Sequence, residues 1–104
     1  MAAGSKVGQQ KGKDWEVVMP RIGHVDMEEE NFAKVVNACR NACGAEHKYY
    51  KDYAIQIKAE LDKEIGPSWH IVVGTNFGSF VGFEHKHIAL FWLEEKGFLC
   101  YKHG

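Results

Sequence analysis

Apolar residues recur at spacings of three and four positions in two successive stretches of the chain, and this spacing is typical of amphipathic helices that turn one face to a core. The first apolar stripe consists of Phe32, Val35, Val36, Cys39, Ala42 and Cys43. The second consists of Tyr50, Tyr53, Ala54, Ile57 and Leu61. The pattern therefore predicts two helices in succession.

The ends of both helices have sequence signals. Asp26, followed three residues later by Glu29, forms a capping pair, so we expect the first helix to begin there. Gly44 should weaken the end of that helix. Gly66 and Pro67 should stop the second helix, because proline cannot continue the helical hydrogen bonds.

After Pro67 the apolar period changes from three-four to two, which indicates strands. Four short strands are expected, at residues 69–73, 77–83, 87–93 and 98–101. Turn-forming residues separate them, so we predict an antiparallel meander with both helices on one face, an α+β fold. A further short strand is expected at Trp15–Met19, at a sheet edge because Pro20 follows it.

The 104 residues have room for one domain. Residues 1–14 carry few apolar side chains and are interpreted as a flexible tail, which leaves 15–104 as the domain. Thirteen Lys and Arg against fourteen Asp and Glu give a net charge of -1, which does not favour nucleic acid or anionic lipid as a partner. The sequence shows neither a membrane-spanning apolar stretch nor a secretory signal, so we expect no membrane partner and a cytoplasmic protein.

The three cysteines are an odd number without the spacing of a disulfide scaffold, so we predict reduced, buried thiols. Cys39 and Cys43, four apart on a helix, would put two metal ligands on one face, but a site needs further ligands. His85 and His87 are likewise better interpreted as exposed turn residues than as metal ligands. No local catalytic signature joins Ser79 or a cysteine to a histidine, so we predict no enzyme activity, no metal and no cofactor.

The strand at 77–83 is unusual because Gly78 and Gly82 alternate with large aromatic anchors. Glycine in a strand often marks a close backbone approach, so an edge strand here would accept an added extended peptide. An ordinary core strand with two glycines explains the pattern equally well. A base-stacking surface for single-stranded nucleic acid would need flanking Lys or Arg, which this strand lacks.

Between about Asp26 and Gly104 the sequence closely resembles the dynein light-chain family of the eight-kilodalton type. The segments that carry this resemblance are Lys51-Asp52-Tyr53-Ala54, Leu61-Asp62-Lys63, Ser68-Trp69-His70 through Asn76-Phe77-Gly78-Ser79-Phe80-Val81, and Glu84-His85-Lys86-His87. The block from Ser68 to Ser79 is the most specific, because rare residue types occur there in the order and spacing of the family.

The resemblance implies a strand-exchanged homodimer with two parallel grooves, each binding one linear peptide by strand addition. Such a dimer would bind dynein intermediate chains or other linear-motif proteins and promote their dimerisation within a microtubule motor complex. The residues implied in peptide binding are Lys51, Asp52, Asn76, Phe77, Gly78, Ser79, Phe80, Val81, Leu90 and Trp92. Those implied at the dimer interface are Trp69, His70, Ser79, Phe80 and Val81.

Several positions depart from the usual family pattern. Thr75 replaces an arginine, Phe80, Leu90 and Trp92 replace tyrosines, and Tyr50 replaces an acidic residue, so we expect a less polar groove and a dedicated partner in an axonemal dynein. The resemblance places the protein in the cytoplasm and cytoskeleton, and leaves open a cilium or flagellum axoneme, a heterodimer with another light chain, and a general dimerisation hub outside the motor.

His70 lies in the block that packs across the two-fold axis in the family. Charging a buried imidazole at that interface would disfavour association, so acid would weaken the dimer. The alternative, a neutral core histidine with no regulatory role, stays open.

Overall fold

The computed structural model describes residues 13–75 and 87–102. In chain order its elements are η1 (Trp15–Val17), β2 (Arg21–Asp26), α1 (Glu29–Ala45), α2 (Tyr50–Glu64), β3 (Trp69–Gly74), β4 (Ile88–Leu93) and β5 (Lys96–Lys102). The strand expected at 77–83 lies outside the described residues, as do most of the expected tail and His85.

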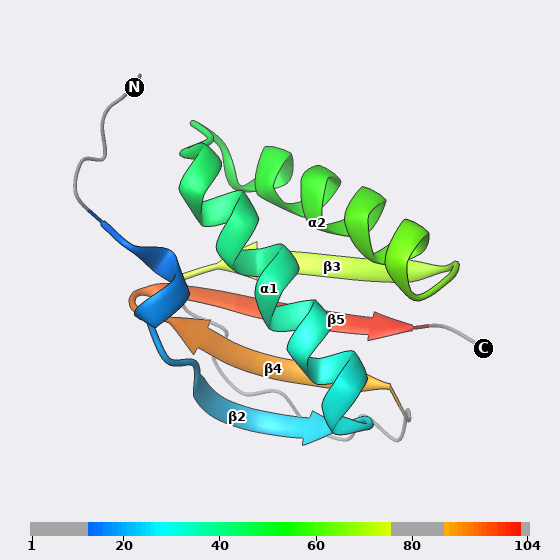
Figure 1. Cartoon of the computed structure of the whole chain (residues 1–104). Helices are drawn as coiled ribbons and strands as arrows, with labels where there is room; N and C mark the ends of the chain where they lie inside the picture. The colour runs from blue at the N-terminus through cyan, green and yellow to red at the C-terminus, as the bar shows by residue number, and fades with distance from the viewer. Residues whose placement is uncertain (1–12, 76–86, 103–104) are drawn as a thin grey trace.

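The four described strands form one antiparallel sheet in the order β2-β4-β5-β3. Both helices cover the same face of this sheet, with α2 along β3 (Figure 1). The predicted α+β arrangement is therefore confirmed. The predicted meander is wrong, because β5 pairs with both β4 and β3 and separates them. A tight turn at Glu94 and Glu95 makes β4 and β5 a hairpin, and β3 joins the outer side of that hairpin.

The core lies between the helices and the sheet. Successive strand side chains point to opposite faces, so Phe91 and Phe98, which stack at 5.7 Å inside the core, mark the helix-covered face. Leu90 and Trp92, which flank Phe91 in β4, lie on the opposite face. The predicted α1 stripe is confirmed by burial of its members from Val35 to Cys43, and in α2 the positions Tyr53, Ile57 and Leu61 are buried.

The N-terminal strand was predicted in the wrong place. Residues 15–17 form the 3-10 helix η1, because the side chain of Asp14 accepts a hydrogen bond from the amide of Glu16, and the Trp15 ring packs against the core. The strand β2 begins only after Pro20, at Arg21. This strand does lie at an edge of the sheet.

The predicted start of α1 is also wrong. Asp26 belongs to β2, and the helix begins at Glu29 after Glu28, which makes no side-chain capping bond. The expectation for the other end agrees with the structure, since the helix ends one residue after Gly44, at Ala45, and Glu46 follows in the left-handed conformation. The predicted end of α2 is confirmed, since the helix stops at Glu64, just before Gly66 and Pro67.

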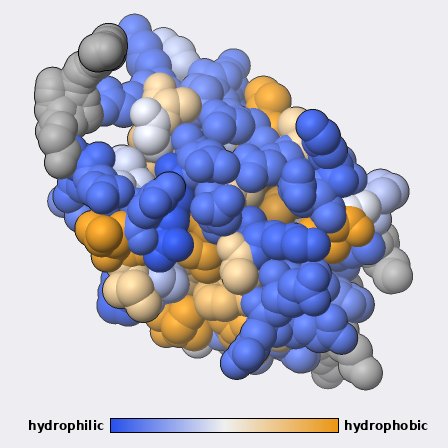
Figure 2. Space-filling view, viewed as in Figure 1, coloured by the Kyte–Doolittle hydropathy of each residue, from blue (hydrophilic) through white to orange (hydrophobic). Residues whose placement is uncertain are grey.

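The three cysteines are free and buried, as predicted. No helix within the described part of the chain is long and apolar enough to cross a membrane. Figure 2 shows a mainly hydrophilic surface over the two helices, whereas apolar side chains gather beside η1 and β2. The exposed apolar residues of that region are Val17, Met19 and Ile22.

Candidate functional site

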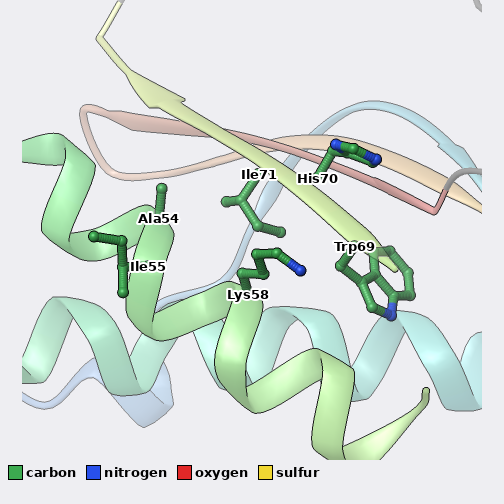
Figure 3. A pocket seen from close by; sticks show the side chains of 6 residues that line it. All are labelled: Ala54, Ile55, Lys58, Trp69, His70 and Ile71. Atoms are coloured by element: carbon green, nitrogen blue, oxygen red, sulfur yellow. The ribbon is translucent and has the colours of Figure 1, made fainter. Parts of the chain in front are cut away.

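An open hollow of about 260 Å³ lies between α2 and β3. Ala54, Ile55 and Lys58 line it from the helix, and Trp69, His70 and Ile71 line it from the strand (Figure 3). Ile55 of α2 is 64% exposed beside the hollow, and Val72 of β3 is 44% exposed on the sheet face opposite the helices. The hollow therefore adjoins a partly apolar surface along one edge of the sheet.

That edge has the properties of a strand-addition site. Among the described strands, β3 pairs only with β5, through six consecutive residue pairs without a bulge. The opposite side of an edge strand presents backbone amides and carbonyls that an extended segment can pair with. The other edge of the sheet, β2, has a register shift at Gly23, and such bulges disfavour strand addition. The regular β3 edge is thus the better template.

Trp69 and His70, both predicted at a dimer interface, point to opposite faces of β3. The Trp69 ring is 1% exposed and belongs to the core of its own chain. Its indole Nε1 is buried, and no described residue accepts a hydrogen bond from it. His70 is exposed on the other face, where its ring stacks on Tyr101 at 5.1 Å and 17°. Their role in an interface stays a prediction.

The predicted peptide-binding residues lie on two layers of the molecule. Lys51 and Asp52 occupy the first turn of α2, which has no side-chain cap, whereas Leu90 and Trp92 lie on the sheet face opposite the helices. Both groups lie toward the end of the molecule that contains the β4–β5 turn. Tyr53, the next residue after Asp52, has its ring centre 5.6 Å from the amine of Lys96 at the start of β5. Trp92 is two residues before the β4–β5 turn. Asn76 through Val81 lie outside the described residues.

Two residues of β2 contact this site and were missed by the sequence analysis. The guanidinium of Arg21 lies 4.5 Å from the centre of the Trp92 ring. Gly23 lies so close to Trp92 that an added Cβ would be 2.8 Å from the ring atom Cζ3. The sequence did contain a signal for these residues, a glycine two positions after the basic Arg21. This signal was not recognised because the strand was predicted before Pro20.

The buried thiols are poor nucleophiles. Burial, followed by a hydrogen bond to Cys100, raises the pKa of Cys39 well above its ordinary value. Burial also raises the pKa of Cys43 to about 11. Since the thiolate is the reactive form, these cysteines are suited to packing. Within residues 13–75 and 87–102, no three histidine, cysteine or acidic side chains are grouped in a way that would hold a metal ion.

Comparison with known proteins places this architecture among the dynein light chains. Residues 19–103 match the family model described as dynein light chain type 1. The fold is similar to the dynein light chain-like domain of the Fasciola hepatica calcium binding protein FhCaBP2, with a TM-score of 0.69, 18% identity, and coverage of 88% of this chain and 98% of that one.

The dynein light chain-like domain of CsTAL3 is also similar, with a TM-score of 0.69, 14% identity, and coverage of 80% of this chain and 90% of that one. At these identities the two structures support the fold alone. The family assignment instead comes from the family model, which extends over most of the sequence. The chain belongs to the dynein light chain type 1 family.

Proposed function

We propose that this protein is a non-catalytic light chain that dimerises and binds extended segments of dynein intermediate chains, or of other linear-motif proteins, by strand addition. The observation that carries the proposal is the regular, unbulged outer edge of β3 beside the hollow at α2. An extended backbone added to such an edge gains main-chain hydrogen bonds, and side-chain pockets then supply specificity. Family membership supports the same conclusion.

Dimerisation would complete the site. Ile55 is an exposed apolar residue of α2 and Val72 is one on the face of β3 opposite the helices, and a second copy that covered both would remove them from water. A symmetric dimer presents the same surface twice. Two grooves in one dimer would hold two identical chains, and the second binding event is strengthened by the high effective concentration that the first creates. The dimer would thereby promote dimerisation of its partner.

The chemistry of the groove suggests how one segment is recognised. The start of α2, which no side chain caps, together with Lys51 and Asp52, would provide donors and an acceptor for one polar ligand side chain such as glutamine. Leu90 and Trp92, which face away from α2 in their own chain, would provide the apolar floor of a groove that a second copy completes. Because these two floor residues lack hydroxyl groups, shape and apolar contact contribute more to selectivity than hydrogen bonding does.

We place the protein with microtubule motor complexes of the cytoplasm and cytoskeleton, with an axonemal dynein as the specific partner complex. The substitutions that make the floor less polar support a dedicated ligand. Family membership also supports a role without catalysis.

Sedimentation and calorimetry test the proposal together. The wild-type chain should sediment as a dimer and bind one glutamine-centred extended peptide per chain. Ile55→Glu should produce a monomer with weakened peptide binding, because it puts a charge on the α2–β3 surface. Met19→Glu, a matched substitution at a residue that is 77% exposed near the opposite edge, should leave both properties unchanged.

A wild-type monomer, or equal effects of the two substitutions, would show that the α2–β3 surface around Ile55 is not the association surface. A dimer that ignores the glutamine-centred peptide but binds segments of an axonemal intermediate chain would keep the proposed function and change the motif. A dimer that binds neither would contradict it.

A further inference from the structure

Tyr50 begins α2 one helical turn before the residues that line the hollow. Side chains four positions apart on a helix lie on the same face, so Tyr50 lies next to Ala54, and Lys51 lies next to Ile55. β3 runs back along α2, so the first turn of the helix lies beside the end of that strand (Figure 1). The helix face that lines the hollow therefore extends to Tyr50 and Lys51.

The ring of Tyr50 packs on a buried tyrosine that has several other contacts. The Tyr50 and Tyr53 rings meet edge to face, with their centres 6.1 Å apart and their planes at 71°. Tyr53 is 4% exposed and belongs to the core. Its ring also meets the His47 ring edge to face at 5.0 Å, and the amine of Lys96 lies 5.6 Å from its centre. Tyr53 is thus a fixed support for Tyr50.

His47 joins this support to the link between the two helices. It lies in that link, directly after the left-handed Glu46. The Oε1 of Gln56, three residues after Tyr53, accepts a hydrogen bond from Nε2 of His47. No side chain caps the start of α2, so this histidine fastens the link to the helix instead. Tyr50 is therefore held in position before a ligand arrives, and a preorganised aromatic side chain loses little conformational freedom on binding.

Tyr50 is still 39% exposed, and a fixed aromatic side chain that is partly in water is a favourable contact for an apolar partner. Tyr49 is also exposed, but the amine of Lys48 lies over its ring at 5.5 Å. Lys48 and Lys51 flank the two tyrosines, and their charges disfavour a basic ligand side chain at this place. The first turn of α2 therefore favours a large apolar side chain.

We propose that Tyr50 is a specificity-determining residue that selects a large apolar side chain in the bound segment, near the polar side chain that Lys51 and Asp52 would hold. This inference rests on the proposed peptide-binding function and names a second ligand residue at the start of α2. Burial of that side chain against the ring supplies the selectivity. Segments with a polar side chain at the same position bind more weakly.

Calorimetric titration with matched peptides tests this inference. The glutamine-centred peptide is made as a series in which Leu, or Asn as a polar side chain of similar shape, occupies each position beside the glutamine in turn. The wild type should prefer Leu over Asn at one position by about tenfold, the range expected for burying most of a leucine side chain. Tyr50→Phe should keep this preference, because it keeps the ring. Tyr50→Ala should abolish it and leave the affinity for the Asn peptide unchanged.

Tyr49→Ala is the matched control, since it removes an exposed tyrosine from the neighbouring position, where the ring contacts Lys48. This variant should keep the Leu preference of the wild type. The bound Leu peptide supplies a second readout by NMR. Its leucine methyl protons should show ring-current shifts on the wild type and on Tyr50→Phe, and should lose them on Tyr50→Ala.

Three results would overturn the role of Tyr50 and leave peptide binding intact. They are equal binding of the Leu and Asn peptides at every position, a Leu preference that survives Tyr50→Ala, and an equal loss of that preference in the two alanine variants. Absence of ring-current shifts on the wild type would also overturn it, whether or not Tyr50→Ala folds. A wild-type protein that binds no peptide of the series would overturn the binding of glutamine-centred segments and this inference with it.

Discussion

The backbone amide of Trp69 donates a hydrogen bond to Oδ1 of Asp62 over 3.0 Å, and this bond ties the last turns of α2 to the first residue of β3. The other oxygen, Oδ2, accepts a hydrogen bond from Lys58 at 2.6 Å. One carboxylate thus positions the helix and the strand that border the candidate site. Removing its charge should affect both stability and the geometry of the β3 edge.

Asp62→Asn should lower the stability of the fold at neutral pH and reduce its sensitivity to acid. The hydrogen bonds from Lys58 and then from the Trp69 amide lower the pKa of Asp62 below its ordinary value of 3.8. Because the folded pKa lies below the unfolded one, the stabilisation is complete above the unfolded value and is lost as pH falls through the folded value. Urea unfolding at neutral pH and at steps below about pH 4 measures how this stabilisation depends on pH.

The control for that prediction is Glu64→Gln, an exposed acid at the end of the same helix. This variant keeps the Asp62 carboxylate and both of its hydrogen bonds, so it should lose stability on acidification as the wild type does. If Asp62→Asn and the wild type lose stability equally on acidification, the two hydrogen bonds do not stabilise the charged carboxylate.

The helices could be predicted from the sequence because the side chains that are buried in them follow the three-four spacing of the apolar residues closely. Val35 and Cys39 of α1 and Ile57 and Leu61 of α2 are all inaccessible, at the spacing that the apolar stripes indicated. The strand order could not be predicted in the same way. Period-two patterns identify strands but not their partners, so nothing in the sequence pattern indicated that β5 would insert between β3 and β4.

The N-terminal error has a different physical cause. Val17 and Val18 have high strand propensity, but Asp14 caps a helical turn and Trp15 packs on the core, so tertiary contact overrides propensity. The true strand was hard to detect because Gly23 shifts the alternation within β2. The same glycine makes room for Trp92, so the missed strand and the missed site residues have one origin.

Cys43 should remain unreactive in the native protein at neutral pH. Burial raises its pKa to about 11, with an opposing contribution from Lys96, so the thiol stays protonated. Reaction with a thiol reagent should be slow without denaturant and should accelerate with unfolding for all three cysteines. Rapid labelling of Cys43 in a fully native sample would show that the thiol is accessible.

The raised pKa also predicts loss of stability in alkali. The ordinary pKa of Cys43 is 9.0, so the unfolded chain loses this proton first. Stability from the neutral thiol is complete below that value and is lost as pH rises through about 11. Cys43→Ala should flatten this decline, although the smaller side chain lowers stability at neutral pH. Unfolding curves of both proteins between pH 8 and 11 make the comparison.

Trp15→Ala should destabilise the fold by about 1–3 kcal/mol, because the ring joins η1 to the core and to the β4–β5 turn. Lys13 and Lys96 lie 5.5 and 5.8 Å from the ring, and Lys13 also pairs with Glu94 at 2.5 Å. Val17→Ala, at a residue that is 70% exposed in the same turn, should change stability by less than about 0.5 kcal/mol. Equal effects in thermal unfolding would mean that η1 does not dock through Trp15.

The end of α1 allows a backbone effect to be separated from a side-chain effect. Glu46 adopts φ 54° and its amide donates to the Cys43 carbonyl at 3.1 Å, a left-handed cap that glycine forms without steric cost. Glu46→Gly should therefore be about 1 kcal/mol more stable than Glu46→Ala, since both lack the same carboxylate and differ in left-handed strain. One position earlier, Ala45→Gly should cost about 1 kcal/mol, because Ala45 is still helical. Urea unfolding of the three variants gives the test: glycine must stabilise relative to alanine at position 46 and destabilise at position 45, and the same sign at both positions would contradict the cap.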